Sequence, residues 1–145
     1  MSEKRRNGFT LIEVLIVIVI MAVLAATIIP QFSTSTEDAK AGQLDFNLHT
    51  LRQQVELYKL HHSGKLPVIT NNALPQLTSK TNADGTVNAN GTYGPYILGE
   101  IPVNPFTNSN KVTASTDGAT KTGGGWLYNA STGQFWADGE APSGT

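Results

Sequence analysis

The chain has 145 residues, enough for one small domain, and it contains no cysteine, which excludes disulfides, thiolate zinc sites and cysteine nucleophiles. Ten Lys and Arg face eleven Asp and Glu, so the net charge is -1 and nucleic acid is not an expected partner. Charged residues are only 14% of the chain, and Gly, Ser, Thr and Asn crowd its second half. This composition suits a surface that faces the outside of the cell.

The N-terminal region combines a basic cluster with a long apolar run. Lys4, Arg5 and Arg6 stand together, and the apolar run extends from Val14 to Ile29. With the apolar residues that precede Glu13, the segment reaches a bilayer-spanning length of roughly 20 residues. The basic cluster predicts a cytoplasmic N-terminus by the positive-inside rule, so the rest of the chain is expected to be exported.

A secretory signal peptide and a plain membrane anchor are two alternatives for this segment. Val23-Leu24-Ala25 offers a small-residue cleavage pattern of the signal-peptide kind. Glu13 argues against both alternatives, because a lone carboxylate inside an apolar segment is costly in lipid and calls for a function.

The string from Lys4 to Glu13, KRRNGFTLIE, supports a third interpretation. It resembles the processing site of type IV prepilins and type II secretion pseudopilins. The resemblance implies that a membrane-embedded peptidase cuts after Gly8 and that the new N-terminal residue, Phe9, is N-methylated. It also implies that Glu13 guides the assembly of subunits.

Beyond the apolar run, Pro30 removes one helical hydrogen bond and predicts a kink. An amphipathic pattern then resumes, and Gly64 supplies a stop signal, so we expect a nearly continuous helix from Phe9 to His62. The apolar stripe consists of Leu44, Leu48, Leu51, Val55 and Tyr58. Its spacing also fits a coiled coil, but it covers only about two heptads, which favours packing against a sheet of the same chain.

Two adjacent histidines, His61 and His62, close this helix. Adjacent helical residues point to different sides, so a shared metal is disfavoured and solvated histidines at a helix end are expected.

From Lys65 onward, short apolar pieces alternate with turn residues, as in a small β-rich head. Turns are predicted at 82–85 and 88–91, a strand or extended segment at 93–98, and an exposed loop at 111–125. The clearest element is a β-hairpin with strands at 126–129 and 134–137. We expect its aromatic residues, with Tyr96 and Phe106, to cover the inner face of the helix.

Two further strings resemble G-type pseudopilins. The segment 101–106, IPVNPF, is similar to their proline-bearing loop, and the ending 137–140, ADGE, is similar to their C-terminal segment. In those proteins a calcium ion holds the loop near the hairpin, which implies Asp117 and Asp138 as calcium ligands here, with plain turn carboxylates as the alternative. The absence of cysteine favours a pseudopilin over those type IV pilins that close a C-terminal loop with a disulfide.

The fold class that we expect is α+β, the type IV pilin fold, with one long N-terminal helix on a small antiparallel sheet. The chain divides into a leader at 1–8, a membrane and polymerisation helix at 9–32, an amphipathic helix at 33–64 and a head at 65–145.

The resemblance implies a structural subunit of a type II secretion pseudopilus, with a major type IV pilin for adhesion, motility or DNA uptake as the alternative. We do not expect an enzyme, because no catalytic motif is present. The implied partners are further copies of the chain, prepilin peptidase, the inner-membrane assembly platform, minor pseudopilins and membrane lipid. The implied location is the bacterial inner membrane, with the head in the periplasm and the filament in the periplasm or at the cell surface.

Overall fold

The computed structural model describes residues 8–118 and 123–139, except for the side chains of 27–35. Residues 1–7, 119–122 and 140–145 lie outside the described part of the chain. Two compact units make up the chain, one from Met1 to Ala39 and one from Lys40 to Thr145. We call the second unit the head.

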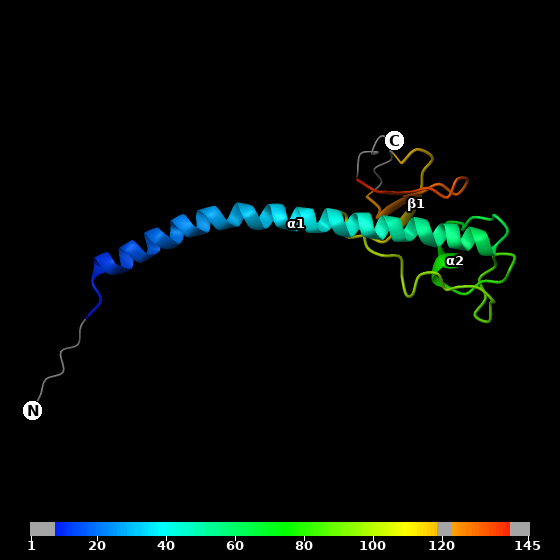
Figure 1. The fold of residues 1–145 in the computed structure, drawn as a ribbon, viewed down its shortest axis with the longest axis horizontal. Coiled ribbons are helices and arrows are strands. Elements are labelled where there is room, and N and C mark those ends of the chain that lie inside the picture. Colours follow the sequence, from blue (N-terminus) through cyan, green and yellow to red (C-terminus); the bar gives the residue numbers. More distant parts are fainter. Residues whose placement is uncertain (1–7, 119–122, 140–145) are drawn as a thin grey trace, which may run out of the picture. The chain divides into compact units, whose positions relative to one another are not determined.

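One helix, α1, runs from Leu11 to His61 through both units (Figure 1). The helix continues through Pro30, whose side chain is among those not described, so the predicted kink stays a prediction. Past the helix end, Gly64 has a φ of 85° and donates its N–H to the carbonyl of Lys59 at 2.9 Å. This left-handed glycine ends the helix as the sequence predicts.

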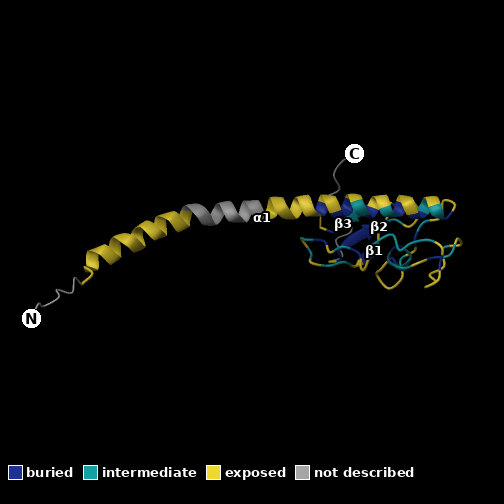
Figure 2. Cartoon of the chain, turned by 60° about the horizontal axis from the view of Figure 1, so that its bottom comes forward, coloured by how far each residue is buried: buried dark blue, intermediate teal, exposed yellow. Residues whose placement is uncertain are grey.

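In the head, the predicted apolar stripe of α1 is buried: Leu51 and Val55 are fully buried, and Leu44, Leu48 and Tyr58 nearly so. Figure 2 shows buried and exposed positions alternating along this part of the helix. The stripe packs on side chains of the same chain, including Leu74, Leu77, Ile101, Val112, Trp126, Tyr128 and Phe135. The prediction that the stripe packs on the chain's own head is confirmed.

The predicted hairpin is present as β2, from Trp126 to Tyr128, and β3, from Phe135 to Ala137, paired antiparallel with Tyr128 opposite Phe135. The ring centroids of those two aromatic residues lie 4.8 Å apart. A further strand, β1, from Val112 to Ala114, pairs parallel with β2. The described sheet is therefore mixed, which corrects the expectation of an antiparallel sheet, while the α+β class is confirmed.

Two local expectations in the head are wrong, and a third is met only in part. The segment 111–125, predicted to be a loop, contains β1, because the fully buried Val112 side chain anchors it against the core. Phe106 is not part of the packed core under the helix, because 53% of its surface is exposed. The segment 93–98, predicted as a strand or an extended segment, forms no strand, and Tyr93 makes an isolated bridge with Thr81.

The turns at 82–85 and 88–91 are confirmed by hydrogen bonds that close each of them. The short helix α2, from Pro75 to Thr78, buries Leu77 under the head core. The Leu77 carbonyl accepts hydrogen bonds from the backbone N–H groups of Tyr96 and Ile97, at 2.9 and 2.8 Å. These bonds and the bridge between Thr81 and Tyr93 hold the 93–98 segment in place.

Candidate functional site

The predicted processing site lies immediately before α1. Gly8, Phe9 and Thr10 have no regular secondary structure, and a Cβ added at Gly8 would meet no atom within 4 Å. Phe9 is 88% exposed. The Gly8–Phe9 peptide bond therefore lies in an open segment, the kind of backbone that a protease can bind in extended form.

The start of α1 is closed by a capping box that the sequence analysis missed. The backbone N–H and the hydroxyl of Thr10 both donate to Oε2 of Glu13, at 2.8 and 2.7 Å. In return, the Glu13 N–H donates to the hydroxyl oxygen of Thr10 at 3.3 Å. The signal was in the sequence, since Thr-x-x-Glu ahead of an apolar run is the capping-box pattern.

Glu13 thus has a local reason to stand in the apolar segment, because its carboxylate accepts two hydrogen bonds at the helix start. Beyond it, the apolar side chains from Val14 to Leu24 are exposed. A helix that exposes such side chains must bury them against lipid or other chains. Within the residues that the structure describes, no helix combines the length and apolar character needed to cross a membrane.

The two carboxylates predicted to bind calcium lie in the head, on either side of the 119–122 segment. Asp138 is buried and its Oδ2 accepts the Gly124 N–H at 2.7 Å, whereas Asp117 is exposed and its Oδ1 accepts the Ser115 hydroxyl at 3.3 Å. Calcium takes six to eight oxygen ligands. In the described ranges no group of three His, Cys, Asp or Glu residues could hold a metal ion. The described residues do not complete a calcium site, and calcium binding stays a prediction.

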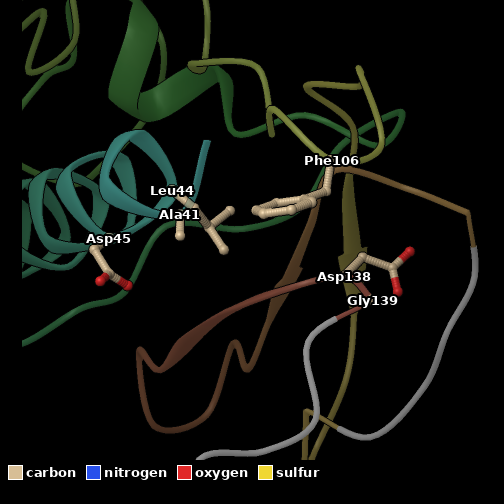
Figure 3. Close-up of a pocket in the computed structure, with 6 residues that line it drawn as sticks. All are labelled: Ala41, Leu44, Asp45, Phe106, Asp138 and Gly139. Atoms are coloured by element: carbon tan, nitrogen blue, oxygen red, sulfur yellow. The ribbon is translucent and has the colours of Figure 1, made fainter. Parts of the chain in front are cut away.

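Asp138 also lines a pocket of about 260 Å³ beside α1, with Ala41, Leu44, Asp45, Phe106 and Gly139. In Figure 3 the side chains of Leu44 and Phe106 point toward each other, while the carboxylate of Asp138 points away from Leu44.

Asn104, which the sequence analysis did not single out, fixes the 101–106 loop to the end of the sheet. Its side chain is fully buried and donates to the carbonyls of Gly125 and Asp138, at 2.7 and 3.3 Å, while its Oδ1 accepts the Phe106 N–H at 2.9 Å. An asparagine inside a proline-bearing loop was the available signal. Asn104 joins the loop and the C-terminal segment, the two regions whose strings resemble G-type pseudopilins.

The expectation that His61 and His62 are solvated is wrong. His62 is fully buried, stacks on Tyr58 with ring centroids 3.9 Å apart, and places Nδ1 2.8 Å from the Tyr58 carbonyl. Its Nε2 lies 3.0 Å from both the Thr81 hydroxyl and the Asn82 carbonyl. His61 is half-buried and bonds the Tyr96 hydroxyl at 3.0 Å. Extending the apolar stripe by four residues from Tyr58 leads to His62, so the stripe itself pointed to its burial.

The family model of the prokaryotic N-terminal methylation motif matches residues 4–29, the segment that contains the open junction and the capped helix start. This motif, one long helix and a small mixed sheet give an α+β chain that is consistent with the type IV pilin fold. The chain is similar to the type II secretion system core protein G of several bacteria. The resemblance to the G-type pseudopilin is thereby confirmed.

Three relatives of that name show the extent of the similarity. The protein of Dickeya chrysanthemi is 38% identical over 61 residues, 42% of this chain and 40% of the relative. The protein of Escherichia coli K12 is 30% identical over 93 residues, 59% and 64% of the two chains. The protein of Vibrio cholerae is 27% identical over 118 residues, 81% and 77%. For the first two, the match spans less than two thirds of the relative's length. No solved structure matches the chain significantly.

Proposed function

We propose that this chain is a structural subunit of a type II secretion pseudopilus. Prepilin peptidase removes residues 1–8, Phe9 becomes the N-methylated N-terminus, and the subunits polymerise through the N-terminal half of α1. The observation that carries this proposal is the methylation motif at 4–29, whose Gly8–Phe9 bond lies open before a capped helix with exposed apolar side chains.

Before assembly, the segment 9–32 anchors the subunit in the inner membrane, with Lys4, Arg5 and Arg6 on the cytoplasmic side. The head then lies in the periplasm, where residues 33–64 carry the 65–145 region. The expected partners are other copies of the chain, the assembly platform and minor pseudopilins. The relatives bear the name of a secretion-system core protein, which supports a structural role in protein export and not a catalytic one.

Glu13 acts in assembly. Its carboxylate lies in an apolar segment, and the methylated amine of Phe9 on a neighbouring copy supplies an opposite charge in the same layer. In the unassembled chain Thr10 satisfies this carboxylate, at 2.7 and 2.8 Å. Docking then exchanges these two local hydrogen bonds for an ion pair in a poorly solvated setting, where electrostatic attraction is stronger than in water.

Intact-mass analysis of the native protein tests the processing step. We expect the loss of the first eight residues and the addition of one methyl group, and Gly8→Ala, which adds a side chain where the protease must bind, should leave the precursor uncut. A mature chain that begins near Ala26 would indicate ordinary signal peptidase and would end this proposal.

A further inference from the structure

The turn at 88–91 presents an asparagine–glycine pair, Asn90–Gly91, at the surface of the head. Asn90 is exposed, and no described residue hydrogen-bonds its side-chain amide. Each of the other described asparagines is followed by a residue that has a side chain. Asn7–Gly8 is the other pair of this kind in the sequence, and Asn7 lies outside the described residues. Asn90 therefore differs from the other described asparagines in the residue that follows it.

Packing in the head requires the glycine of this pair. Gly91 is buried, and a Cβ on it would lie 2.5 Å from the carbonyl carbon and oxygen of Thr81. Two backbone hydrogen bonds between Thr81 and Tyr93, at 2.9 and 3.0 Å, hold the two segments at this distance. The fold therefore excludes a side chain from the position after Asn90.

A glycine in this position makes the preceding asparagine prone to deamidation, because no side chain hinders the next backbone nitrogen from reaching the amide carbon. Asparagine is one of the thermolabile residues of proteins for this reason. The Gly91 nitrogen bonds to Cγ of Asn90 and gives up its proton, the bond from Cγ to Nδ2 breaks, and Nδ2 leaves with that proton as ammonia. Water then opens the resulting succinimide ring at one of its two carbonyls. One opening gives aspartate, and the other gives isoaspartate, whose main chain runs through Cγ.

We propose that Asn90–Gly91 is a deamidation site of the folded head and that the 88–91 turn controls its rate. The Gly91 N–H donates to the Asn88 carbonyl at 2.8 Å, and the Asn90 N–H donates to Oδ1 of Asn88 at 3.0 Å. The first of these bonds keeps the Gly91 nitrogen from attacking, so the reaction proceeds from a local opening of the turn. An exposed turn opens at a much lower free energy than the whole head unfolds.

The two products differ in their effect on the head. Aspartate adds a charge at an exposed position and leaves the length of the main chain unchanged. Isoaspartate adds one methylene to the main chain beside Gly91, where the backbone of Thr81 leaves no room. The Thr81 hydroxyl also lies 3.0 Å from Nε2 of His62, so a displaced Thr81 disturbs the buried end of α1. The isoaspartyl head is therefore less stable than the aspartyl head.

Peptide mapping by mass spectrometry of the full-length chain, aged in detergent at neutral pH, measures the rate. Asn90 should deamidate at least tenfold faster than Asn108, an exposed asparagine that is followed by Ser109. Labelling with isoaspartyl methyltransferase should mark the peptide 81–111, and Asn90→Gln, whose longer side chain closes a ring far more slowly, should abolish that label. Deamidation of Asn90 no faster than that of Asn108 overturns the proposal.

Asn88→Ala tests the control by the turn. It removes the Oδ1 that accepts from Asn90 and the bond from Nδ2 to Oδ1 of Asn82, at 3.1 Å, so the turn should open more often. Deamidation of Asn90 should become at least threefold faster. Asn110→Ala, which removes an exposed side-chain bond to Glu100, should leave the rate unchanged. Equal rates in the parent and Asn88→Ala overturn the role of the turn.

Urea unfolding of the separated products tests the effect on the head. The isoaspartyl chain should unfold at a lower urea concentration than the parent, whereas Asn90→Asp, which supplies the aspartyl product directly, should keep the parental midpoint. Equal midpoints for the isoaspartyl chain and the parent overturn the predicted loss of stability. None of these measurements requires filaments, so their outcomes are independent of the proposed function.

Discussion

At the scale of single residues, the N-terminus of α1 gives one carboxylate two uses. Glu13 caps the first helical turn through Thr10, in bonds of 2.7 and 2.8 Å, and it is also the charge that we assign to assembly. The two uses separate chemically, because a capping box works with glutamine as well as glutamate, whereas an ion pair needs the charge.

We therefore predict that Glu13→Gln leaves the helix start intact and impairs filament formation. Gln keeps an oxygen that can accept from Thr10, so amide hydrogen exchange at 11–14 should stay within about twofold of the parent. Processing after Gly8 should also be unchanged. Sheared filaments, measured by electron microscopy and immunoblotting, should fall at least tenfold while subunit accumulates in the membrane.

Thr10→Val is the control for the cap. Valine has nearly the shape of threonine but lacks the hydroxyl, and the charge of Glu13 is unchanged. It should speed amide exchange in the first turn, consistent with a lost cap of about 1 kcal/mol. If Glu13→Gln speeds exchange as much as Thr10→Val does, helix fraying and not the lost charge accounts for its defect. Normal filament yield from Glu13→Gln would show that the charge does not register the subunits.

At the scale of elements, the sheet depends on a close approach between the 101–110 loop and the start of β2. A Cβ on Gly125 would lie 2.0 Å from the carbonyl oxygen of Ser109. The carbonyl of Gly125 also accepts from Asn104 and from the Asp138 N–H, at 2.7 and 3.2 Å. The loop, the sheet and the C-terminal segment therefore meet at one residue that has no room for a side chain.

Gly125→Ala should consequently destabilise the head by about 3 kcal/mol or more, because the clash is with backbone and no rotamer relieves it. Gly42→Ala is the matched control, because a Cβ there meets nothing within 4 Å and the position is helical. Alanine should stabilise that position by up to about 1 kcal/mol. Urea unfolding of the full-length variants in detergent measures both, and a neutral Gly125→Ala would contradict the close approach.

At the scale of the whole molecule, the head core is rich in buried tyrosine. Burial raises the pKa of Tyr128, whose hydroxyl donates to the Pro67 carbonyl at 3.1 Å. Burial also raises the pKa of Tyr58 and of Tyr96. In an unfolded chain tyrosine ionises near pH 10, so the unfolded state gives up these protons first as the pH rises.

The ionisation of these tyrosines should therefore leave the free energy of unfolding unchanged below about pH 10 and lower it above that pH, until the tyrosines of the folded head ionise as well. Tyr128→Phe removes one ionisable group and keeps the ring. It should lower stability at pH 8 by about 1 kcal/mol, through the lost hydrogen bond, and should make the decline between pH 9.5 and about 11 shallower. Urea midpoints across this range measure the effect, and equal slopes in the two proteins would exclude Tyr128 as a source of the decline.

The sequence alone predicted those features whose causes are local. The long helix was predicted from Phe9 to His62 and is observed from Leu11 to His61. This helix, its end at Gly64, the turns at 82–85 and 88–91 and the hairpin at 126–137 follow from periodicity and turn residues within a few positions of one another. The same holds for the methylation motif at 4–29, which is contiguous. Even the missed capping box of Thr10 and Glu13 was readable, because it spans only four residues.

Only the tertiary structure decided features that depend on distant parts of the chain. Val112 forms a strand because β2 lies beside it, and His62 is buried because the Thr81 hydroxyl and the Asn82 carbonyl lie within hydrogen-bond distance of its ring. Phe106 is 53% exposed because the core closes without it. Burial and strand pairing depend on segments far along the chain, and no local sequence pattern specifies which distant segment will pack on a given residue. The exposure of Phe46 and Leu60 on α1 is a further example, because an apolar side chain stays exposed only where no other part of the folded chain packs on it.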